Sequence, residues 1–476
     1  MGKARSFVKK VMYAVGANFL SLFVSLLTTL IVPKFLGVEV EQYGYLQIYL
    51  FYTSYIGFFH FGWCDGIFLR DGGKKYAELD KPVYSAQFWL LTIVQVILAL
   101  VIMIGGIFFG GGAEYRTICF AIAVSLIIFI PRTMLSYYLQ ATNRIKEYAS
   151  ITTVGRMIYG ISIIATVLLC NPRYEYFVWG DVFGKFCALL VSVWWCRDIV
   201  FSKPANLIVS VKEAFKNISI GSKLMFANIA SMLITGVVNW GIQQVWSVET
   251  YGRISFTLNV SNLLLTFISA VALVLYPTLR RTEQERLPAI YTKMRNALMI
   301  PMLGFLVLYY PAELILSAWL PQYAESMRYM AILFPMCIYA AQMTLLIQTY
   351  MNVFRLEKKI LVVNIIGVAF AIATTLISVF WMKNLTLAML SVVLNQMFRC
   401  IYAEIVLSKH IGVTVIRDIC LETVMTVMFI CANWLVGGWL GVCIYMIGYL
   451  AYLCIKHRDI KNLISFFKME KEESVA

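Results

Sequence analysis

Residues 85–109 have the sequence SAQFWLLTIVQVILALVIMIGGIFF, which contains no charged side chain. A hydrocarbon core about 30 Å thick takes about 20 apolar residues to cross as a helix, because each residue adds about 1.5 Å. This run can therefore span a bilayer. Thirteen similar runs surround it with only short polar gaps between them, so the chain is predicted to lie almost wholly within a membrane. The fourteen predicted spans are residues 11–33, 44–69, 85–109, 118–139, 150–170, 177–196, 223–246, 254–276, 297–317, 329–351, 360–382, 385–407, 418–436 and 438–455.

The composition agrees with this interpretation. Hydrophobic residues make up 61% of the chain and charged residues 14%, whereas a soluble domain carries about 25% charged residues. The fold class is therefore predicted to be an all-α polytopic membrane protein. The 11 cysteines form no CxxC pair, so neither a disulfide framework nor a metal site is expected, and no cofactor is expected either. The first apolar run lacks a small-residue cleavage site and is expected to be a span rather than a signal peptide.

The basic residues orient the chain. Of the 40 Lys and Arg, thirty fall in segments that are cytoplasmic if the N-terminus is inside, six fall in external loops, and four lie within spans. Cytoplasmic loops carry such an excess in membrane proteins, so both termini are predicted to be cytoplasmic. The net charge of +15 is explained by this placement, and no nucleic-acid partner is expected. Membrane lipids are the expected surroundings.

A short motif occurs twice at equivalent places in the predicted topology. Residues 40–44 (VEQYG) join spans 1 and 2, and residues 248–252 (VETYG) join spans 7 and 8. We interpret this as a duplicated unit of six spans, giving two parallel lobes with a substrate site in a central cavity between them, a plan known among transporters. Within the linker, residues 205–219 are predicted to form a short surface helix. The predicted domains are residues 1–209 (spans 1–6), 210–410 (spans 7–12) and 411–476 (spans 13–14 and a cytoplasmic tail).

Three junctions carry a resemblance to a known family. Residues 32–37 (VPKFLG), 138–146 (YLQATNRIK) and 275–281 (LYPTLRR) resemble the junctions of bacterial polysaccharide-unit flippases. These are Wzx-type transporters of the multidrug/oligosaccharidyl-lipid/polysaccharide superfamily. The resemblance covers essentially the whole chain. Fourteen spans are also more similar to the flippase branches of that superfamily than to its drug-extruding branch, which typically has twelve.

The resemblance implies an activity and its partners. It implies that an oligosaccharide unit linked to a polyprenyl pyrophosphate, such as undecaprenyl pyrophosphate, is moved from the inner to the outer leaflet of the bacterial cytoplasmic membrane. The two lobes would rock around the central cavity by alternating access. A polysaccharide polymerase is an implied partner, and the alternatives for the polymer served are O-antigen of lipopolysaccharide, capsule, exopolysaccharide and a wall polymer.

Four cations within spans are the candidate substrate-binding residues, namely Arg132, Arg156, Lys185 and Arg399. A charge in hydrocarbon is costly, so each should face a wet cavity or a partner. Guanidinium groups bind phosphate oxygens with paired hydrogen bonds, which suits a pyrophosphate cargo. Alternatives stay open: Arg156 and Arg399 would also fit side chains that reach the cytoplasmic surface, and Lys185 would fit a structural ion pair with Asp181 on the same helix face.

Transport against a gradient needs an energy source. The sequence has no GxxxxGK[ST] loop, so an H⁺ or Na⁺ gradient or the membrane potential is expected to drive it. The candidate ion-coupling residues are Asp65, Asp181, Glu404 and His60. Alternatives are a helix-capping role for Glu404 and a packing role for His60. Candidate sugar contacts are Asn259, Asn262 and Asn395, which would equally suit hydrogen bonds between helices.

Two other functions predict different sequence features from those of a flippase. A cation-coupled multidrug extruder should have mainly acidic residues in its cavity, whereas basic residues outnumber acidic ones within these spans. A membrane glycan polymerase or acyltransferase should show clustered catalytic groups at one face, whereas the three His lie far apart. A transporter without catalytic residues is therefore expected, rather than an enzyme.

Overall fold

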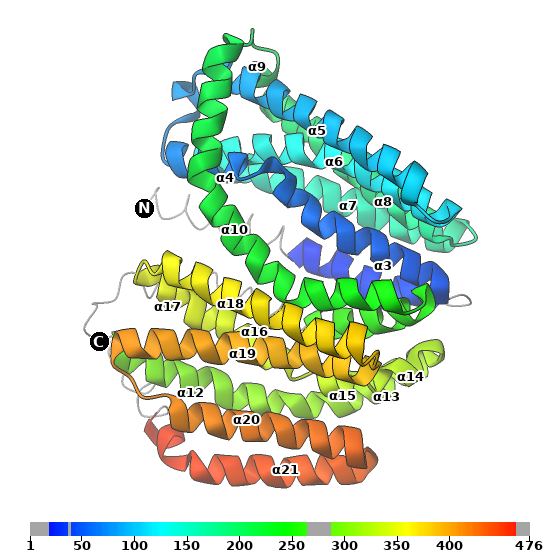
Figure 1. The fold of residues 1–476 in the computed structure, drawn as a ribbon, viewed down its shortest axis with the longest axis vertical. Helices are drawn as coiled ribbons and strands as arrows, with labels where there is room; N and C mark the ends of the chain where they lie inside the picture. Colours follow the sequence, from blue (N-terminus) through cyan, green and yellow to red (C-terminus); the bar gives the residue numbers. More distant parts are fainter. Residues whose placement is uncertain (1–18, 37–39, 264–286, 463–476) are drawn as a thin grey trace. The chain divides into compact units, whose positions relative to one another are not determined.

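The computed structural model describes residues 19–36, 40–263 and 287–462. Every regular element in these ranges is a helix, and they contain no β-strand (Figure 1). The predicted fold class, an all-α polytopic membrane protein, is confirmed. Helices satisfy every backbone hydrogen bond within one segment, which is what a chain in hydrocarbon requires.

Eleven of the fourteen predicted spans are helices long and apolar enough to cross a membrane in the described part of the chain. Most begin a few residues earlier or end a few residues later than the sequence predicted, because turns of helix continue beyond the apolar segment into the polar ends. The eleven spans are Lys81–Phe108, Ala113–Ala141, Ile145–Leu169, Tyr174–Trp195, Leu207–Val245, Leu287–Trp319, Met330–Val353, Glu357–Trp381, Leu385–Ile411, Ile416–Val436 and Gly438–Ile455.

The other three predicted spans are mainly helical where the structure describes them. The first is the apolar helix Phe19–Phe35, and its predicted start at residue 11 lies outside the described residues. Residues 248–263 are helical, and the rest of the eighth predicted span lies outside the description. The second span is not one helix, because it divides into α3 (Val40–Tyr55), the 3₁₀ helix η2 (Ile56–His60) and α4 (Trp63–Asp71).

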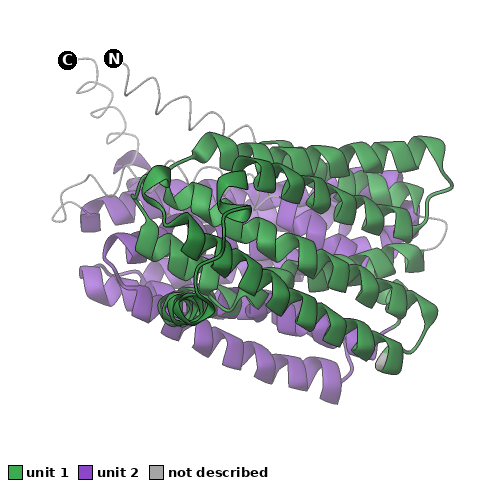
Figure 2. Ribbon diagram, turned by 90° about the horizontal axis from the view of Figure 1, so that it is seen from above, with its two compact units in different colours: residues 1–229, 247–252 green, residues 230–246, 253–476 purple. Residues whose placement is uncertain are grey.

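The chain divides into two compact units, coloured separately in Figure 2. Unit 1 comprises residues 1–229 and 247–252, and unit 2 comprises residues 230–246 and 253–476. Helix α10 (Leu207–Val245) crosses this division. Its 39 residues form one continuous helix, so the expectation of a separate surface helix at 205–219 is wrong. Both the linker and the seventh span have helical sequences, no Pro lies between them, and the helix continues through the one glycine there, Gly221. The domain ranges expected from the repeat stay a prediction.

Unit 1 is built around four long helices. Helix α5 packs against α6, and α7 packs against α8, which also contacts α6. The core of the unit is an apolar cluster that includes Leu91, Leu126, Ile130 and Tyr138. The remaining elements of unit 1 are η1 (Leu27–Ile31), α2 (Val32–Phe35), η3 (Tyr76–Glu78), α5 (Lys81–Phe109), α6 (Ala113–Ala141), α7 (Ile145–Leu169), α8 (Tyr174–Trp195) and α9 (Arg197–Val200).

Unit 2 has its own apolar core, in which the paired helices α18 and α19 lie side by side (Figure 1). Helices α20 and α21 pack on each other in the same unit. The elements of unit 2 after α10 are α12 (Leu287–Phe305), η5 (Leu306–Leu308), α13 (Tyr309–Trp319), η6 (Pro321–Tyr323), α14 (Ala324–Met327), α15 (Met330–Leu333), α16 (Met336–Ala341), η7 (Gln342–Ile347), α17 (Gln348–Val353), α18 (Glu357–Thr375), η8 (Leu376–Trp381), α19 (Leu385–Ile411), α20 (Ile416–Cys431), η9 (Ala432–Val436) and α21 (Gly438–Ile455).

The two copies of the repeated motif meet within unit 1. A Cβ atom added to Gly252 would lie 2.9 Å from the backbone nitrogen of Gly44, the glycine at the equivalent position of the first copy. Between helices in a membrane, such small residues let the backbones approach closely and gain van der Waals contact. The glycine that ends each motif is therefore explained by this contact.

Candidate functional site

Glycines on α7 and α8 bring two of the predicted cations together. A Cβ atom added to Gly184 would lie 2.7 Å from the carbonyl oxygen of Gly155, so the two helices can approach this closely only without side chains at these positions. The next residue on each helix is a cation, Arg156 on α7 and Lys185 on α8. Close packing of the two helices thus places both charges beside one cavity.

A third predicted cation comes from α6, which continues as one helix through Pro131. Arg132 follows this proline and is partly buried. Its guanidinium carbon lies 4.8 Å from the centre of the Phe129 ring. The Nε atom of Arg132 is buried and donates to no described residue. A buried donor without an acceptor is costly, so this N–H remains available to a further acceptor.

The carboxylate of Asp181 neutralises one of these cations. Lys185 Nζ lies 2.5 Å from Asp181 Oδ2, as its spacing of four residues on α8 allows. The hydroxyl of Tyr49 on α3 donates to the same oxygen at 2.8 Å and lies 3.0 Å from Ser125 Oγ. The structural ion pair that the sequence left open is therefore present, and it lies at the cavity wall.

These groups line a cavity of about 400 Å³ within unit 1. The volume is in the range of pockets that hold small ligands. Three cations face one carboxylate, so with all four groups ionised the lining carries a formal charge of +2. The eleven lining residues are Leu50, Thr53, Ser54, Phe129, Arg132, Thr152, Gly155, Arg156, Tyr159, Asp181 and Lys185.

The fourth predicted cation lies in unit 2 and is not among the residues that line this cavity. Arg399 on α19 donates to Asn364 Oδ1 at 3.0 Å and to Ser231 Oγ at 2.8 Å. It is buried among helices of its own unit, so the alternative in which it extends to the cytoplasmic surface is wrong. Arg156, by contrast, is exposed and lines the cavity.

The predicted sugar contacts also lie in unit 2. Asn395 on α19 is fully buried and accepts a hydrogen bond from Thr374 Oγ1 at 3.0 Å, while its amide nitrogen donates to no described residue. Asn259 is partly buried and Asn262 is exposed, both in the helical residues 248–263. The structure therefore brings Arg132, Arg156, Lys185 and Asp181 together, and the three asparagines are not among the residues that line their cavity.

Residues 73–328 match a family of proteins described as polysaccharide biosynthesis proteins, which is more than half of the chain. The chain belongs to this family. Among curated proteins, none matches the sequence. Membership in the family confirms the resemblance that the junction motifs carry.

Solved transporter structures share the fold of this polysaccharide biosynthesis family member. The lipid II flippase MurJ, in an inward closed conformation, aligns with a TM-score of 0.64 and 14% identity over 95% of this chain and 99% of its own. A multidrug resistance transporter of the MATE family and MOP superfamily, inward-facing, aligns with a TM-score of 0.63 and 11% identity over 82% of this chain and 94% of its own. At these identities the likeness shows the fold alone, and that fold is the one the motifs predicted.

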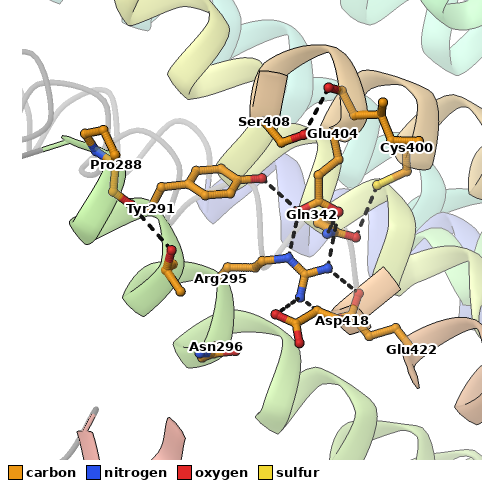
Figure 3. Close-up of polar contacts among 12 residues, drawn as sticks. Pro288, Tyr291, Arg295, Asn296, Gln342, Cys400, Glu404, Ser408, Asp418 and Glu422 are labelled. Carbon is orange, nitrogen blue, oxygen red and sulfur yellow. Dashed lines mark hydrogen bonds and ion pairs between the residues drawn. The ribbon is translucent and has the colours of Figure 1, made fainter. Parts of the chain in front are cut away.

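Glu404, a predicted ion-coupling residue, lies in a charge cluster of unit 2 (Figure 3). Arg295 on α12 donates from Nε to Glu404 Oε1 at 2.7 Å and from Nη1 to Glu422 Oε1 at 2.6 Å. Tyr291 and Gln342 donate to Glu404 as well. The expected helix-capping role of Glu404 is therefore wrong, because its carboxylate binds across helices rather than to the end of its own.

Sequence reasoning missed Arg295. This residue is one of the thirty basic residues in the segments predicted to be cytoplasmic, yet its side chain is only 1% exposed. Lys456 is another of these thirty, at the start of the predicted tail, and its Nζ atom is buried 2.8 Å from Asp418 Oδ1. Both lie a few residues beyond the apolar runs, where composition does not distinguish a loop from the last turn of a helix.

The remaining two candidates, His60 and Asp65, lie in unit 1 at the break in span 2. Asp65 accepts a hydrogen bond from Tyr137 at 3.2 Å, and His60 accepts one from the backbone N–H of Gly62 at 3.0 Å. Neither residue lines the charged cavity. No group of three or more His, Cys, Asp or Glu that could hold a metal ion occurs in the described ranges.

Proposed function

We propose that this protein moves an oligosaccharide linked to a polyprenyl pyrophosphate from the inner to the outer leaflet of the bacterial cytoplasmic membrane, by alternating access. The observation that carries the proposal is the surplus of positive charge in the unit 1 cavity, with Arg132, Arg156 and Lys185 against Asp181. Moving a pyrophosphate through a medium of low dielectric constant requires such compensation. The lipid tail stays in the bilayer while the headgroup passes the cations.

Each cation has a distinct part in this proposal. Arg132 offers a planar guanidinium with a buried donor that has no described acceptor, and it binds phosphate oxygens with paired hydrogen bonds. Arg156 is exposed to the cavity and adds long-range attraction. Lys185 is held by Asp181 until a phosphate oxygen competes for it. Hydroxyl groups of Thr53, Ser54 and Thr152 then face the sugar. Arg399 and Asn395 form a second candidate contact set in unit 2.

The charge balance argues against a drug extruder. Such a transporter usually carries cationic cargo and needs free carboxylates in its cavity. The one carboxylate of this lining, Asp181, already pairs with Lys185 and accepts from Tyr49. Drug export is therefore not proposed as the function, and the test below would detect it. Both termini are proposed to be cytoplasmic, with a polysaccharide polymerase as the partner that uses the flipped unit.

The proposal is tested by reconstituting the full chain in vesicles with a fluorescent pyrophosphate-linked glycolipid. Dithionite added outside quenches only probe in the outer leaflet, so the quenched fraction measures flipping. We expect flipping by the wild type and none by Arg132→Ala. Arg132→Lys retains part of the activity if charge suffices and loses it if the planar fork is needed.

A matched control comes from the same helix. Arg116 lies near the start of α6, is exposed, and does not line the cavity. Arg116→Ala should flip the probe like the wild type. Full activity of Arg132→Ala would remove this residue from the site. Drug efflux without glycolipid movement would favour the extruder, and bond cleavage or polymer growth would favour an enzyme.

A further inference from the structure

Five carboxylate side chains are buried in the part of the chain that the structure describes, and one of them differs from the rest. Asp65 has neither Lys nor Arg within 4.0 Å among the described residues. Its nearest basic group is the Nε2 atom of His60, 3.8 Å from Oδ2. Each of the other four carboxylates lies beside a Lys or Arg. Asp71 pairs with Lys74, Asp181 pairs with Lys185, and Glu404 and Glu422 both pair with Arg295.

The surroundings of Asp65 make its ionised form costly. Only 5% of this residue is exposed, and the same is true of His60. The hydroxyl of Tyr137 donates to Oδ1 at 3.2 Å, but the 3.8 Å to His60 is too long for a hydrogen bond. An isolated buried carboxylate is strongly disfavoured in its charged form. One added proton, on either member of the pair, removes this penalty.

His60 also holds the break in span 2. The break passes through two residues with left-handed backbone, Phe61 at φ 53° and Gly62 at φ 80°. His60 Nδ1 accepts the N–H of Gly62 at 3.0 Å, so Nδ1 carries a lone pair and the neutral ring bears its proton on Nε2. A proton arriving at Nδ1 would remove this acceptor. The shape of the break therefore depends on where the proton of the pair lies.

The break packs directly against α10. A Cβ atom added to Gly62 would lie 2.7 Å from the carbonyl carbon of Gly221, and one added to Gly66 would lie 2.8 Å from the Cα atom of Asn217. One turn further on, Arg70 of α4 pairs with Glu213 of α10 at 2.8 Å. Helix α10 is the element whose first part groups with unit 1 and whose last part groups with unit 2.

We infer that His60 and Asp65 together bind the proton that drives the transport proposed above. We also infer that proton binding changes the shape of the break in span 2 and that this change is transmitted to α10. This inference rests on the proposed function. The proton binds from the outside, is shared by the imidazole and the carboxylate, and leaves to the cytoplasm as the cargo moves outward. A proton fits better than Na⁺, because a lone carboxylate and an imidazole do not supply the several oxygen ligands that hard cations prefer.

The neighbouring elements add few other titratable groups. Helix α6 supplies Tyr137, whose ring also lies 6.3 Å from that of His60. Cys64 is on the same helix as Asp65 and is buried. Helix α10 brings Gly221 and Ser222 to the break, and neither titrates in this range. Helix α5 contributes Gln95, which donates to the carbonyl oxygen of Phe59. The response to pH is therefore assigned to His60 and Asp65 as a pair.

The first test detects the proton without any cargo. Infrared difference spectra of the full chain in vesicles, taken between neutral and acidic pH, should show the carbonyl stretch of a newly protonated carboxylic acid. This band should disappear in Asp65→Asn. It should persist in Asp71→Asn, whose buried carboxylate on the same helix binds Lys74 at 2.8 Å. Persistence of the band in Asp65→Asn would overturn the inference.

The second test connects the proton to transport. With one proton exchanged per cargo, each pH unit across the vesicle changes the final leaflet ratio of the pyrophosphate-linked probe about tenfold. Wild type should show this dependence. Asp65→Asn should equilibrate the probe with no response to the gradient, and so should His60→Asn, whose amide oxygen can still accept the Gly62 N–H. A tenfold response retained by both variants would contradict the proton site.

The two proposals fail in different ways. If the wild type moves no glycolipid while the infrared band is lost in Asp65→Asn, the proposed function fails and the proton site stands. If the wild type flips the probe but responds to a Na⁺ gradient instead of a pH gradient, the proton site fails and the flippase stands. Each result therefore judges one proposal without depending on the other.

Discussion

At the scale of residues, charge compensation decides which side chains are structural and which are free to bind. Arg295 binds two glutamates with four hydrogen bonds and is closed to any ligand. Arg132 has a buried donor with no described acceptor. The sequence predicted Arg132 because it lies deep within an apolar run. It did not predict Arg295, because the partners Glu404 and Glu422 come from distant segments.

Removing the centre of the unit 2 cluster should destabilise the protein strongly. Arg295→Met leaves Glu404 and Glu422 buried without a cation, which costs about 3–5 kcal/mol. We expect a large fall in the thermal unfolding midpoint in detergent. Lys75→Ala serves as the control, because the exposed pair of Lys75 and Glu78 is worth at most about 1 kcal/mol. Equal midpoints for the two variants would show that the cluster does not support the fold.

Loss of the exposed cavity cation should affect transport rather than stability. Arg156 is exposed and forms no ion pair with a described residue, so Arg156→Gln should change the free energy of unfolding by less than about 0.5 kcal/mol. The flipping rate of the pyrophosphate-linked probe should fall, because the formal charge of the lining drops from +2 to +1. An unchanged rate in vesicles would exclude Arg156 from the path of the cargo.

At the scale of elements, small residues decide how closely helices approach. The glycines of α7 and α8 set the distance between Arg156 and Lys185, and those of α4 and α10 hold the break in span 2 against its neighbour. The sequence predicted where these helices lie, from their apolar runs. It did not predict the break itself, because residues 44–69 are long enough for one span and a glycine such as Gly62 does not by itself mark a break. Nor did it predict that α10 would continue through the linker, since amphipathic and apolar segments are equally helical.

Two glycine substitutions should have opposite effects. Gly184→Ala places a Cβ atom 2.7 Å from the Gly155 carbonyl oxygen, so α7 and α8 must separate, at a cost of about 1–3 kcal/mol. Gly105 on α5 has open space around it, and Gly105→Ala should stabilise the helix by up to about 1 kcal/mol. Thermal unfolding of both variants compares them. A Gly184→Ala variant at least as stable as the wild type would contradict the close contact.

At the scale of the whole molecule, the pattern of charge and hydropathy was sufficient to predict the fold class. Fourteen apolar runs predicted an all-α membrane protein, and eleven of them are long helices in the described residues. The motif glycines Gly44 and Gly252 meet in the structure, as a repeat allows but does not require. The charged cavity, by contrast, depends on side chains from four helices. The apolar runs indicate how deep each of these side chains lies in the membrane, but they do not indicate which side chains of other helices lie next to it.

The predicted orientation is tested with single cysteines in a variant without the native ones. Cysteine at Arg173, between α7 and α8, should react with a membrane-impermeant maleimide added to intact cells. Cysteine at Lys203, between α9 and α10, should react only after the membrane is opened. This follows from the excess of Lys and Arg in the segments predicted to be cytoplasmic. The reverse labelling would invert the topology and with it the direction of export.

The central claim is that the cations of the unit 1 cavity hold a phosphate headgroup in transit, and a structure with a bound pyrophosphate-linked glycolipid tests it most directly. We expect diphosphate density within hydrogen-bond distance of Arg132, with Arg156 and Lys185 beside it. Diphosphate density bound elsewhere, with Arg132 facing an empty cavity, would contradict it.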